Sequence, residues 1–322
     1  MSGATRLRTF GAMHGADLAE LDSYATRYRG ITSSTPPHSR WVSEDGWGLG
    51  SGTHLSDGRT VLRRLGGGSE HEVMLVKDRR YGVCVAKLAR PSLVRDGLSC
   101  TVLAREANAM LSVSHGTVVA CLDVDLVGPF PHLLLEYVPG FTLRETLRAS
   151  GPLGPRATLT LGVGMAQALA AVASAGWMHL DVKPENLIVS PARLIDFSVS
   201  CRINDREARS LGVGTPAYMA PEQLGSDAAT MEIGPAADVY ALGTTLIEAL
   251  TNQPAQPGVP DHISPALRGA LLATRSRVRA WRPSAAELAG VFEHELSLVA
   301  GGHLAAGDGL PSEWPGSGNG WC

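Results

Sequence analysis

The 322-residue sequence predicts an α+β fold with two lobes, a β-rich lobe followed by a helical lobe. Up to residue 137 the chain reads as short strands and a single helix, separated by glycine-containing or charged turns. After residue 142 the apolar residues recur at the three- and four-residue spacing of helices. With 44% hydrophobic and 18% charged residues, the chain can bury a sizeable core.

The first lobe is predicted to begin near Asp57 with an antiparallel meander, because a glycine turn and a charged turn separate its first three strands. The predicted strands are residues 59–65, 72–76, 81–88, 118–126 and 132–137. A helix over residues 98–113 lies between the third and fourth strands. This lobe is therefore a sheet with one helix.

The second lobe is predicted to be almost entirely helical. Its predicted helices are residues 142–149, 153–177, 235–251, 263–274 and 284–300. Pro235 fits the preference for proline in the first turn of a helix. Residues 159–177 are uncharged but rich in Gly, Ala, Ser and Thr, which favours a buried core helix over a membrane span.

We expect a folded domain over residues 58–300, with a first lobe at 58–136 and a second lobe at 141–300. A flexible tail is expected at 301–322, which is rich in Gly and Pro.

A flexible extension is expected at residues 1–57, because residues 33–37 and 46–52 have the composition of loops. The alternative for this extension is a docking or autoinhibitory arm that uses Trp41 and Trp47.

Composition narrows the class of protein. The net charge of −3 argues against a general nucleic-acid-binding role. The five cysteines are widely spaced without a C-x-x-C pair, so reduced thiols are expected and a zinc site is not. The N-terminus has no apolar run typical of a secretory signal. We therefore expect a cytoplasmic protein without a membrane span.

One polar stretch contains the candidate catalytic residues. Residues 179–186 read HLDVKPEN, and Asp181, Lys183, Asn186 and Asp196 lie within 16 residues, on loops between short β segments. Transfer of a phosphoryl group needs oxygen ligands for Mg²⁺, a carboxylate that orients a hydroxyl, and a cation near the developing charge. This set of residues supplies all three.

The first lobe contains possible partners for a bound phosphate. Gly66 and Gly68 would let the backbone approach an anion closely, because neither carries a Cβ. Lys87 stands alone in an apolar strand, where a buried ammonium needs an anionic partner. Glu106 is the only carboxylate of the predicted helix over residues 98–113.

In this order the residues resemble those of bacterial, eukaryotic-like serine/threonine protein kinases. The resemblance covers residues 57–300 and includes His115, the Ala220-Pro221-Glu222 motif, Asp238 and Arg282. It implies a two-lobed protein-kinase-like fold, with a β-rich N-lobe and an α-helical C-lobe. It also implies transfer of the γ-phosphoryl group of ATP, with Mg²⁺, to a serine or threonine hydroxyl of a protein.

The resemblance assigns catalytic and metal-binding roles. Asp181 would orient the substrate hydroxyl and accept its proton, and Lys183 would offset charge at the γ-phosphate. Asn186 and Asp196 would bind Mg²⁺. Lys183 lies two residues after Asp181, which resembles serine/threonine rather than tyrosine specificity.

The resemblance also assigns nucleotide-binding and structural roles. Lys87, paired with Glu106, would hold the α- and β-phosphates. The other implied nucleotide-binding residues are Gly66, Gly68, Val73, Ala86, Glu136, Val138 and Ile188. Backbone groups of Glu136 and Val138 would bind adenine. A Glu222–Arg282 pair and Asp238 would be structural.

Three positions depart from the family pattern. Leu180 replaces an arginine that normally contacts a phosphate on the activation segment, so phosphorylation there should matter less. Ser198 replaces a glycine of the metal-binding loop. His71 stands where a third glycine is usual. None of the three removes a phosphate- or metal-binding group.

Two alternatives remain beside an active protein kinase. The departures are compatible with a pseudokinase that acts as a nucleotide-binding scaffold. For the kinase itself, a regulatory partner is expected as a source of its input. A small-molecule phosphotransferase would share Asp181, Asn186 and Asp196, but it usually lacks the equivalents of Lys183 and of the Ala220-Pro221-Glu222 motif.

Overall fold

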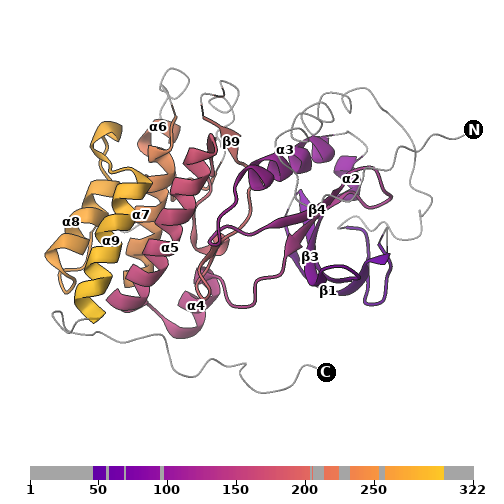
Figure 1. The fold of residues 1–322 in the computed structure, drawn as a ribbon, viewed down its shortest axis with the longest axis horizontal. Helices are drawn as coiled ribbons and strands as arrows, with labels where there is room; N and C mark the ends of the chain where they lie inside the picture. Colours follow the sequence, from indigo (N-terminus) through magenta and orange to yellow (C-terminus); the bar gives the residue numbers. More distant parts are fainter. Residues whose placement is uncertain are drawn as a thin grey trace, which may run out of the picture. The chain divides into compact units, whose positions relative to one another are not determined.

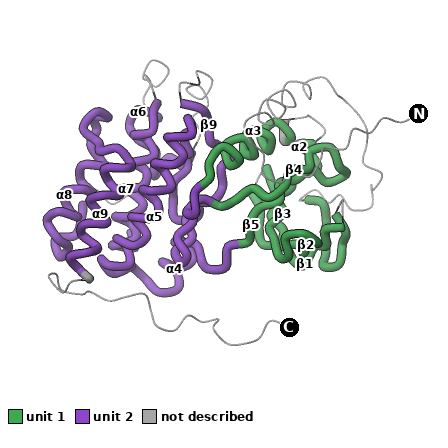
Figure 2. Tube along the Cα trace, viewed as in Figure 1, with its two compact units in different colours: residues 1–114, 119–137 green, residues 115–118, 138–322 purple. Residues whose placement is uncertain are grey.

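The computed structural model describes residues 46–55, 58–68, 70–94, 98–203, 205, 214–224, 233–253 and 258–300. These residues form two compact units, which Figure 2 colours separately. Unit 1 holds the described residues up to 114 together with 119–137, and unit 2 holds 115–118 together with those from 138 onward. Residues 1–45 of the predicted extension and the predicted tail at 301–322 lie outside the described part of the chain.

Unit 1 is built on one antiparallel sheet of five strands in the order β1-β2-β3-β5-β4 (Figure 1). The strands are β1 (Thr60–Gly67), β2 (His71–Asp78), β3 (Gly82–Ala89), β4 (Cys121–Asp125) and β5 (His132–Glu136). The turn between β2 and β3 is closed by Asp78, whose Oδ1 accepts from the N–H groups of Arg80 and Tyr81. The five predicted strands are confirmed.

The helices of unit 1 are α2 (Pro91–Val94) and α3 (Leu98–Ser112). Helix α3 contacts β3, β4 and β5, and its buried Leu103, Ala107 and Met110 lie at helical spacing. The predicted helix over residues 98–113 is confirmed. The single turn of α2 was not predicted, because four residues are too few to show a period.

Residues 46–55 are part of the fold, and we call them the N-terminal strap. Trp47, Leu49 and Leu55 are buried in one apolar cluster with residues of the sheet that include Met74 and Leu134. The predicted flexible extension therefore does not include this segment. Its glycines suggested a loop, but Trp47 and Leu49 are buried while Gly48 and Gly50 are exposed, so the segment contributes its apolar side chains to the core.

Unit 2 is mainly helical, as predicted (Figure 1). Its helices are α4 (Leu143–Ser150), α5 (Pro155–Ser174), α6 (Pro221–Leu224), α7 (Ala236–Thr251), α8 (Pro265–Thr274) and α9 (Ala285–Ala300). Helix α4 starts with a capping box between Thr142 and Glu145, and α8 starts with Ser264 accepting from the Leu267 N–H. Only the one-turn α6 was not predicted.

Helix α5 is the central helix of unit 2 and contacts α7 and α9. Eleven of its 20 residues are buried. By length and composition α5 could cross a membrane, but 61% of its most apolar window is buried inside the fold. This degree of burial is typical of a core helix, and it does not indicate a membrane span.

Short β pairs fix the polar stretch at both ends. The segments are β6 (Trp177–Met178), the 3₁₀ turn η3 (Pro184–Asn186), β7 (Leu187–Ile188), β8 (Arg193–Leu194) and β9 (Cys201–Arg202). Strand β6 pairs with β9, and β7 pairs with β8. The loops that carry Asp181 and Asp196 therefore start and end on hydrogen-bonded β segments.

Candidate active site

Lys87 and Glu106 form a buried ion pair in unit 1. The distance from Lys87 Nζ to Glu106 Oε1 is 2.7 Å, and the two side chains are 8% and 0% exposed. The strand β3 positions the lysine and the helix α3 positions the glutamate. An ammonium carries three N–H donors, so the bond to Glu106 orients Nζ, and such a group can bind more than one anionic oxygen.

Strand register decides which residues share a face with Lys87. Lys87 lies opposite Val73 on β2 and Leu133 on β5, so these three side chains are neighbours. Ala86, which was predicted to contact the nucleotide, is buried in the apolar cluster that contains the strap. Side chains alternate along a strand, so Ala86 lies on the face opposite to Lys87, and Val85 is the neighbour on the same face as Lys87.

The glycine turn connects β1 to β2. A Cβ at Gly66 or Gly68 would meet no atom within 4 Å, so packing requires a glycine at neither position. A Cβ at Gly67 would lie 2.7 Å from the His71 carbonyl oxygen. Gly67, which sequence reasoning did not single out, is therefore required by the hairpin. The open space at Gly66 and Gly68 is what a closely bound phosphate needs.

The predicted adenine-binding residues lie at the end of β5 and beyond. The Glu136 N–H donates to the Ala120 carbonyl oxygen at 2.9 Å. The carbonyl of Glu136 is therefore the backbone group that fits the predicted role. Val138 and Ile188 belong to unit 2, where both are buried, and Ile188 lies on β7.

In unit 2, the buried carboxylate of Asp238 fixes the start of the polar stretch. Its Oδ2 accepts from the His179 N–H at 2.8 Å, and its Oδ1 accepts from the Leu180 N–H at 2.7 Å. Burial raises the pKa of Asp238, although His179 and the two N–H groups favour the charged form. These bonds hold Leu180 at a φ of 63°, a left-handed conformation that is strained for leucine.

Asp181 is held from three sides. Its Oδ1 accepts from the Thr215 hydroxyl at 2.8 Å, and its Oδ2 lies 2.7 Å from Lys183 Nζ. The Nδ2 group of Asn186 donates to Asp181 Oδ2 at 3.0 Å and to the Asp181 carbonyl at 2.8 Å. Both amide hydrogens of Asn186 are thus used, and its Oδ1 is the side-chain atom able to bind a cation.

Asp196 follows β8 in a left-handed conformation, with a φ of 64°. The Ser198 N–H donates to Asp196 Oδ1 at 3.3 Å. Ser198 itself does not have a positive φ, so the usual glycine is not required there. The replacement by serine is therefore compatible with the loop geometry.

Asn186 and Asp196 offer oxygen donors of the kind that Mg²⁺ prefers. Among the described residues, no group of three His, Cys, Asp or Glu could hold a metal ion. A site with two protein ligands fits Mg²⁺ in particular, because this ion keeps several waters and is completed by substrate phosphates.

His179 links the two loops. Its Nδ1 accepts from the Asp181 N–H at 3.3 Å, so its Nε2 carries the proton and donates to the Ile195 carbonyl at 3.2 Å. Its ring also packs edge-on against Phe197, with centroids 4.7 Å apart. The loop with Asp181 and the loop before Asp196 are therefore positioned together.

Leu180 packs in an apolar cluster that we call the Leu180 cluster. Its members are Met178, Leu180, Cys201, Ala220, Ile233 and Ala237. Ala220 precedes α6 and Ala237 lies in α7, so the side chain that replaces the usual arginine is in contact with apolar groups from both. Cys201 is buried there, which favours an inert thiol.

The predicted Glu222–Arg282 pair is present. Arg282 donates through its two terminal nitrogens to the two carboxylate oxygens of Glu222, at 2.7 and 2.8 Å, and both side chains are buried. Arg282 also donates to the carbonyls of Ser276 and Ala236. The pair therefore holds α6 against the start of α7.

Sequence reasoning missed a second polar network beside the polar stretch. Arg144 on α4 donates to Glu185, Glu248 and the Tyr218 hydroxyl at 2.7, 2.6 and 2.8 Å. The Tyr218 hydroxyl donates to Glu248 at 2.6 Å. Arg144 lies 74 residues from Tyr218 and 104 from Glu248, so no local pattern could have revealed the network.

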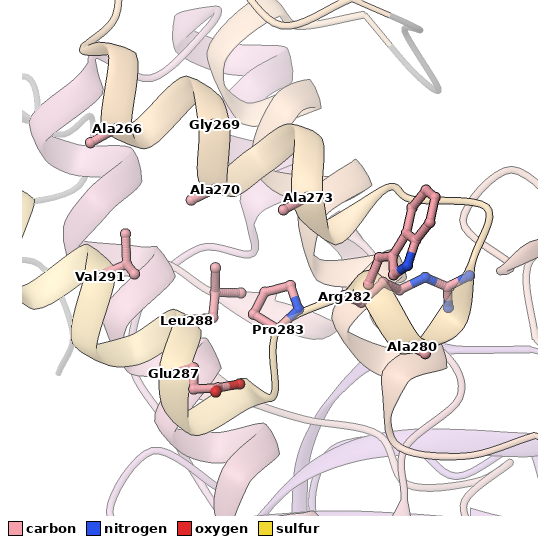
Figure 3. A pocket seen from close by; sticks show the side chains of 11 residues that line it. Ala266, Gly269, Ala270, Ala273, Ala280, Arg282, Pro283, Glu287, Leu288 and Val291 are labelled. Carbon is pink, nitrogen blue, oxygen red and sulfur yellow. The ribbon is translucent and has the colours of Figure 1, made fainter.

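Unit 2 also has a hollow of about 530 Å³, which is lined by Arg282 of the structural pair but by none of the predicted catalytic, nucleotide-binding or metal-binding residues. Figure 3 shows Ala270 and Ala273 of α8 on one side and Leu288 and Val291 of α9 on the other. Trp281, in the 3₁₀ turn η5 (Arg279–Trp281), lines it as well and is 74% exposed. The described polar chemistry lies elsewhere, at Asp181 and its neighbours.

A lysine–glutamate pair in a five-stranded unit, together with an Asp, Asn and Asp set in a helical unit, defines a phosphoryl-transfer protein of the kinase class. Comparison with known families agrees. The protein kinase domain family matches residues 59–275, and the chain belongs to this family.

Three curated relatives of this chain come from bacteria. The chain is 34% identical over 212 residues to serine/threonine-protein kinase PknB of Mycobacterium leprae, which covers 62% of this chain and 33% of the relative. It is 33% identical over 214 residues to PknB of Mycobacterium tuberculosis, covering 63% and 34%. It is 34% identical over 195 residues to serine/threonine-protein kinase AfsK of Streptomyces griseus, covering 59% and 24%. The chain thus spans about a third or less of these relatives.

Proposed function

We propose that this protein transfers the γ-phosphoryl group of ATP to serine or threonine hydroxyls of a protein substrate, with Mg²⁺. The arrangement around Asp181 carries the proposal. Its carboxylate is held by Asn186, Lys183 and Thr215 at distances of 2.7–3.0 Å, so it is oriented before any substrate arrives. The matched relatives are named serine/threonine-protein kinases, which supports the same reaction.

Each residue of the site has its own proposed role. Asp181 would orient the substrate hydroxyl and accept its proton, a contribution of about 10²–10⁴ in rate for a positioned base. Lys183 would offset negative charge beside it, and Lys87 would hold phosphate oxygens in unit 1. Asn186 and Asp196 would hold Mg²⁺, which when bound neutralises charge on the phosphate oxygens.

The Lys183–Thr215 contact favours a protein substrate over a small molecule. Thr215 belongs to the segment before Ala220-Pro221-Glu222, and its hydroxyl accepts from Lys183 Nζ at 2.9 Å. This contact joins the catalytic stretch to the segment that would dock a polypeptide. A small-molecule phosphotransferase needs no such segment. The proposal includes a cytoplasmic location, no nucleic-acid partner, and control by a regulatory partner.

The test is transfer of radiolabelled phosphate from ATP to the chain itself and to generic protein substrates, with and without Mg²⁺. Asp181→Asn should lower the rate by about 10²–10⁴. Asp261→Asn is the matched control, because Asp261 has an exposed side chain outside the site. Lys87→Met should also abolish transfer.

A wild-type protein that binds nucleotide but transfers no phosphate would instead establish a pseudokinase. Transfer to small alcohols or aminoglycosides, but not to proteins, would establish a small-molecule phosphotransferase. Equal turnover in Asp181→Asn and wild type would show that the site assignment is wrong.

A further inference from the structure

The N-terminal strap is anchored next to the end of β3. The ring of Trp47 is 2% exposed and packs edge-on against Phe130, with centroids 5.1 Å apart. The indole N–H of Trp47 donates to the Ala89 carbonyl oxygen at 2.7 Å. Because Ala89 is the last residue of β3, the strap is fixed two residues after Lys87.

The same tryptophan is bonded to the strand that leads out of the glycine turn. The backbone N–H of Trp47 donates to Glu72 Oε2 at 2.7 Å. Glu72 is buried, and a Cβ at Gly46 would lie 2.2 Å from its Oε1. The carboxylate is thus in direct contact with the strap backbone, and a side chain at residue 46 would displace it.

Glu72 connects the strap to the glycine hairpin. It pairs with Gly67 across the β1–β2 ladder, one residue after Gly66. Its Oε1 also lies 3.6 Å from Nε of Arg64 on β1. One carboxylate therefore joins the strap, β2 and β1 at the base of the turn.

Arg90 holds the other side of the turn. Its Nε donates to the Gly68 carbonyl at 2.6 Å, and its backbone N–H donates to the Glu70 carbonyl at 3.0 Å. Arg90 directly follows Ala89 in the chain. The hydrogen bonds and the backbone between them therefore form a closed ring, which runs from Trp47 through Glu72, the glycine turn, Arg90 and Ala89 back to Trp47.

We propose that Trp47 and Glu72 are positioning residues for nucleotide binding, because they hold the glycine turn in the conformation that receives phosphates. The inference rests on the proposed function, and it assigns a role to a segment outside the residues that match the kinase family. The ring explains how the hairpin keeps its shape with His71 in place of a third glycine. The strap thereby affects the affinity for ATP without contacting ATP.

The test compares Glu72→Ala, Glu72→Gln and Val76→Ala in the full chain. Glu72→Ala removes the acceptor, and we expect the KM for ATP to rise about tenfold, as for a lost charge-assisted hydrogen bond, with little change in kcat. Glu72→Gln keeps an oxygen acceptor for the Trp47 N–H and should restore most of the affinity. Val76→Ala is the destabilising control, because Val76 is buried on the same strand and in the same cluster.

A second measurement does not depend on activity. Amide hydrogen exchange across residues 64–72, without nucleotide, should speed up in Glu72→Ala and in Trp47→Phe, but not in Val76→Ala. The proposal is overturned if Val76→Ala raises the KM for ATP as much as Glu72→Ala does, or if exchange in the turn is unchanged. If the wild-type protein showed no kinase activity, the proposed function would be refuted. The hydrogen-exchange data would still decide whether the strap holds the glycine turn.

Discussion

The Thr215 hydroxyl lies between two charged groups of the polar stretch. It donates to Asp181 Oδ1 at 2.8 Å and accepts from Lys183 Nζ at 2.9 Å. Thr215 is 34 residues from Asp181 in sequence. The segment before Ala220-Pro221-Glu222 therefore takes part in orienting the carboxylate. The polar stretch alone does not fix the geometry of Asp181, its proposed base.

Thr215→Ala should lower kcat for a serine substrate by about 10–100-fold, because Asp181 and Lys183 would lose the hydroxyl that joins them. The KM for ATP should stay within about twofold, since the Thr215 hydroxyl bonds to Asp181 and Lys183, neither of which is a predicted nucleotide-binding residue except through the phosphate being transferred. Thr215→Ser keeps the hydroxyl and should retain most of the activity. Steady-state kinetics of the three proteins provides the measurement.

The matched control is Thr160→Ala, which removes an exposed hydroxyl that donates to the Arg156 carbonyl on α5. If Thr215→Ala and Thr160→Ala turned over equally fast, the hydroxyl of Thr215 would have no positioning role.

Leu180 predicts a kinase that does not need a phosphate on its activation segment. Apolar contacts within the Leu180 cluster replace the arginine–phosphate contact of other family members. Treatment with a phosphatase should therefore change the activity by less than about twofold, because no arginine at this position responds to charge. A decrease of tenfold or more on dephosphorylation would contradict this reading.

The same cluster predicts that the usual arginine cannot simply be restored. Leu180→Arg would bury a charge among apolar groups, and we expect a loss of about 3–5 kcal/mol in the free energy of unfolding. Leu224→Arg is the control, because Leu224 is 56% exposed. Urea denaturation of both variants measures the difference.

Features of the fold that follow from local periodicity or from the order of motifs could be predicted from the sequence. The five strands, α3 and the long helices of unit 2 follow from spacing that can be counted along the chain. The Lys87–Glu106 and Glu222–Arg282 pairs followed from the kinase resemblance, and both are present at 2.7 Å. The strands and helices need only neighbours along the chain, whereas the two ion pairs join residues 19 and 60 positions apart and needed the resemblance.

The rest depends on packing between distant segments. Ala86 came from the kinase resemblance, and only the strand alternation shows that it lies on the face opposite to Lys87. Gly67 was overlooked, because the reason for it is a clash with the His71 carbonyl that only the register reveals. The strap was read as a loop, since glycine content gives no indication that Trp47 fills a core. Such contacts cannot be counted along the chain.

A buried polar network in unit 1 predicts a stability that depends on pH. Arg59 donates to Asp78 at 3.0 Å, to Asp123, and to His132 Nε2 at 2.6 Å. An arginine has no acceptor, so Nε2 of His132 is unprotonated and its Nδ1–H donates to the Phe130 carbonyl at 2.6 Å. Burial, followed by the charge of Arg59, lowers the pKa of His132 below 6.5.

The direction of this pH dependence follows from the difference in the pKa of His132 between the folded and unfolded states. Well above pH 6.5 His132 is neutral in both the folded and the unfolded state, and its contribution to stability is complete. As the pH falls below 6.5 the unfolded chain binds a proton that the folded chain resists, so stability is lost, at up to about 1.4 kcal/mol per pH unit. Denaturation of wild type and His132→Gln between pH 5 and about pH 8 should show this slope in the wild type alone. His294→Gln, an exposed histidine on α9, should keep the wild-type slope, and a slope retained in His132→Gln would refute the assignment.

The Glu222–Arg282 pair predicts strongly non-additive mutations. Glu222→Leu alone should cost about 3–5 kcal/mol of unfolding free energy, because it leaves the guanidinium of Arg282 buried without its carboxylate. Arg282→Met alone should cost a similar amount, because it leaves the carboxylate of Glu222 buried without its guanidinium. The double variant should be more stable than the sum of the two losses by about 2 kcal/mol or more, because neither charge then remains buried. It should not regain wild-type stability fully, since Arg282 also bonds the carbonyls of Ser276 and Ala236. A double-mutant cycle by urea denaturation measures the coupling, and strictly additive losses would mean that the pair contributes only as two separate packing groups.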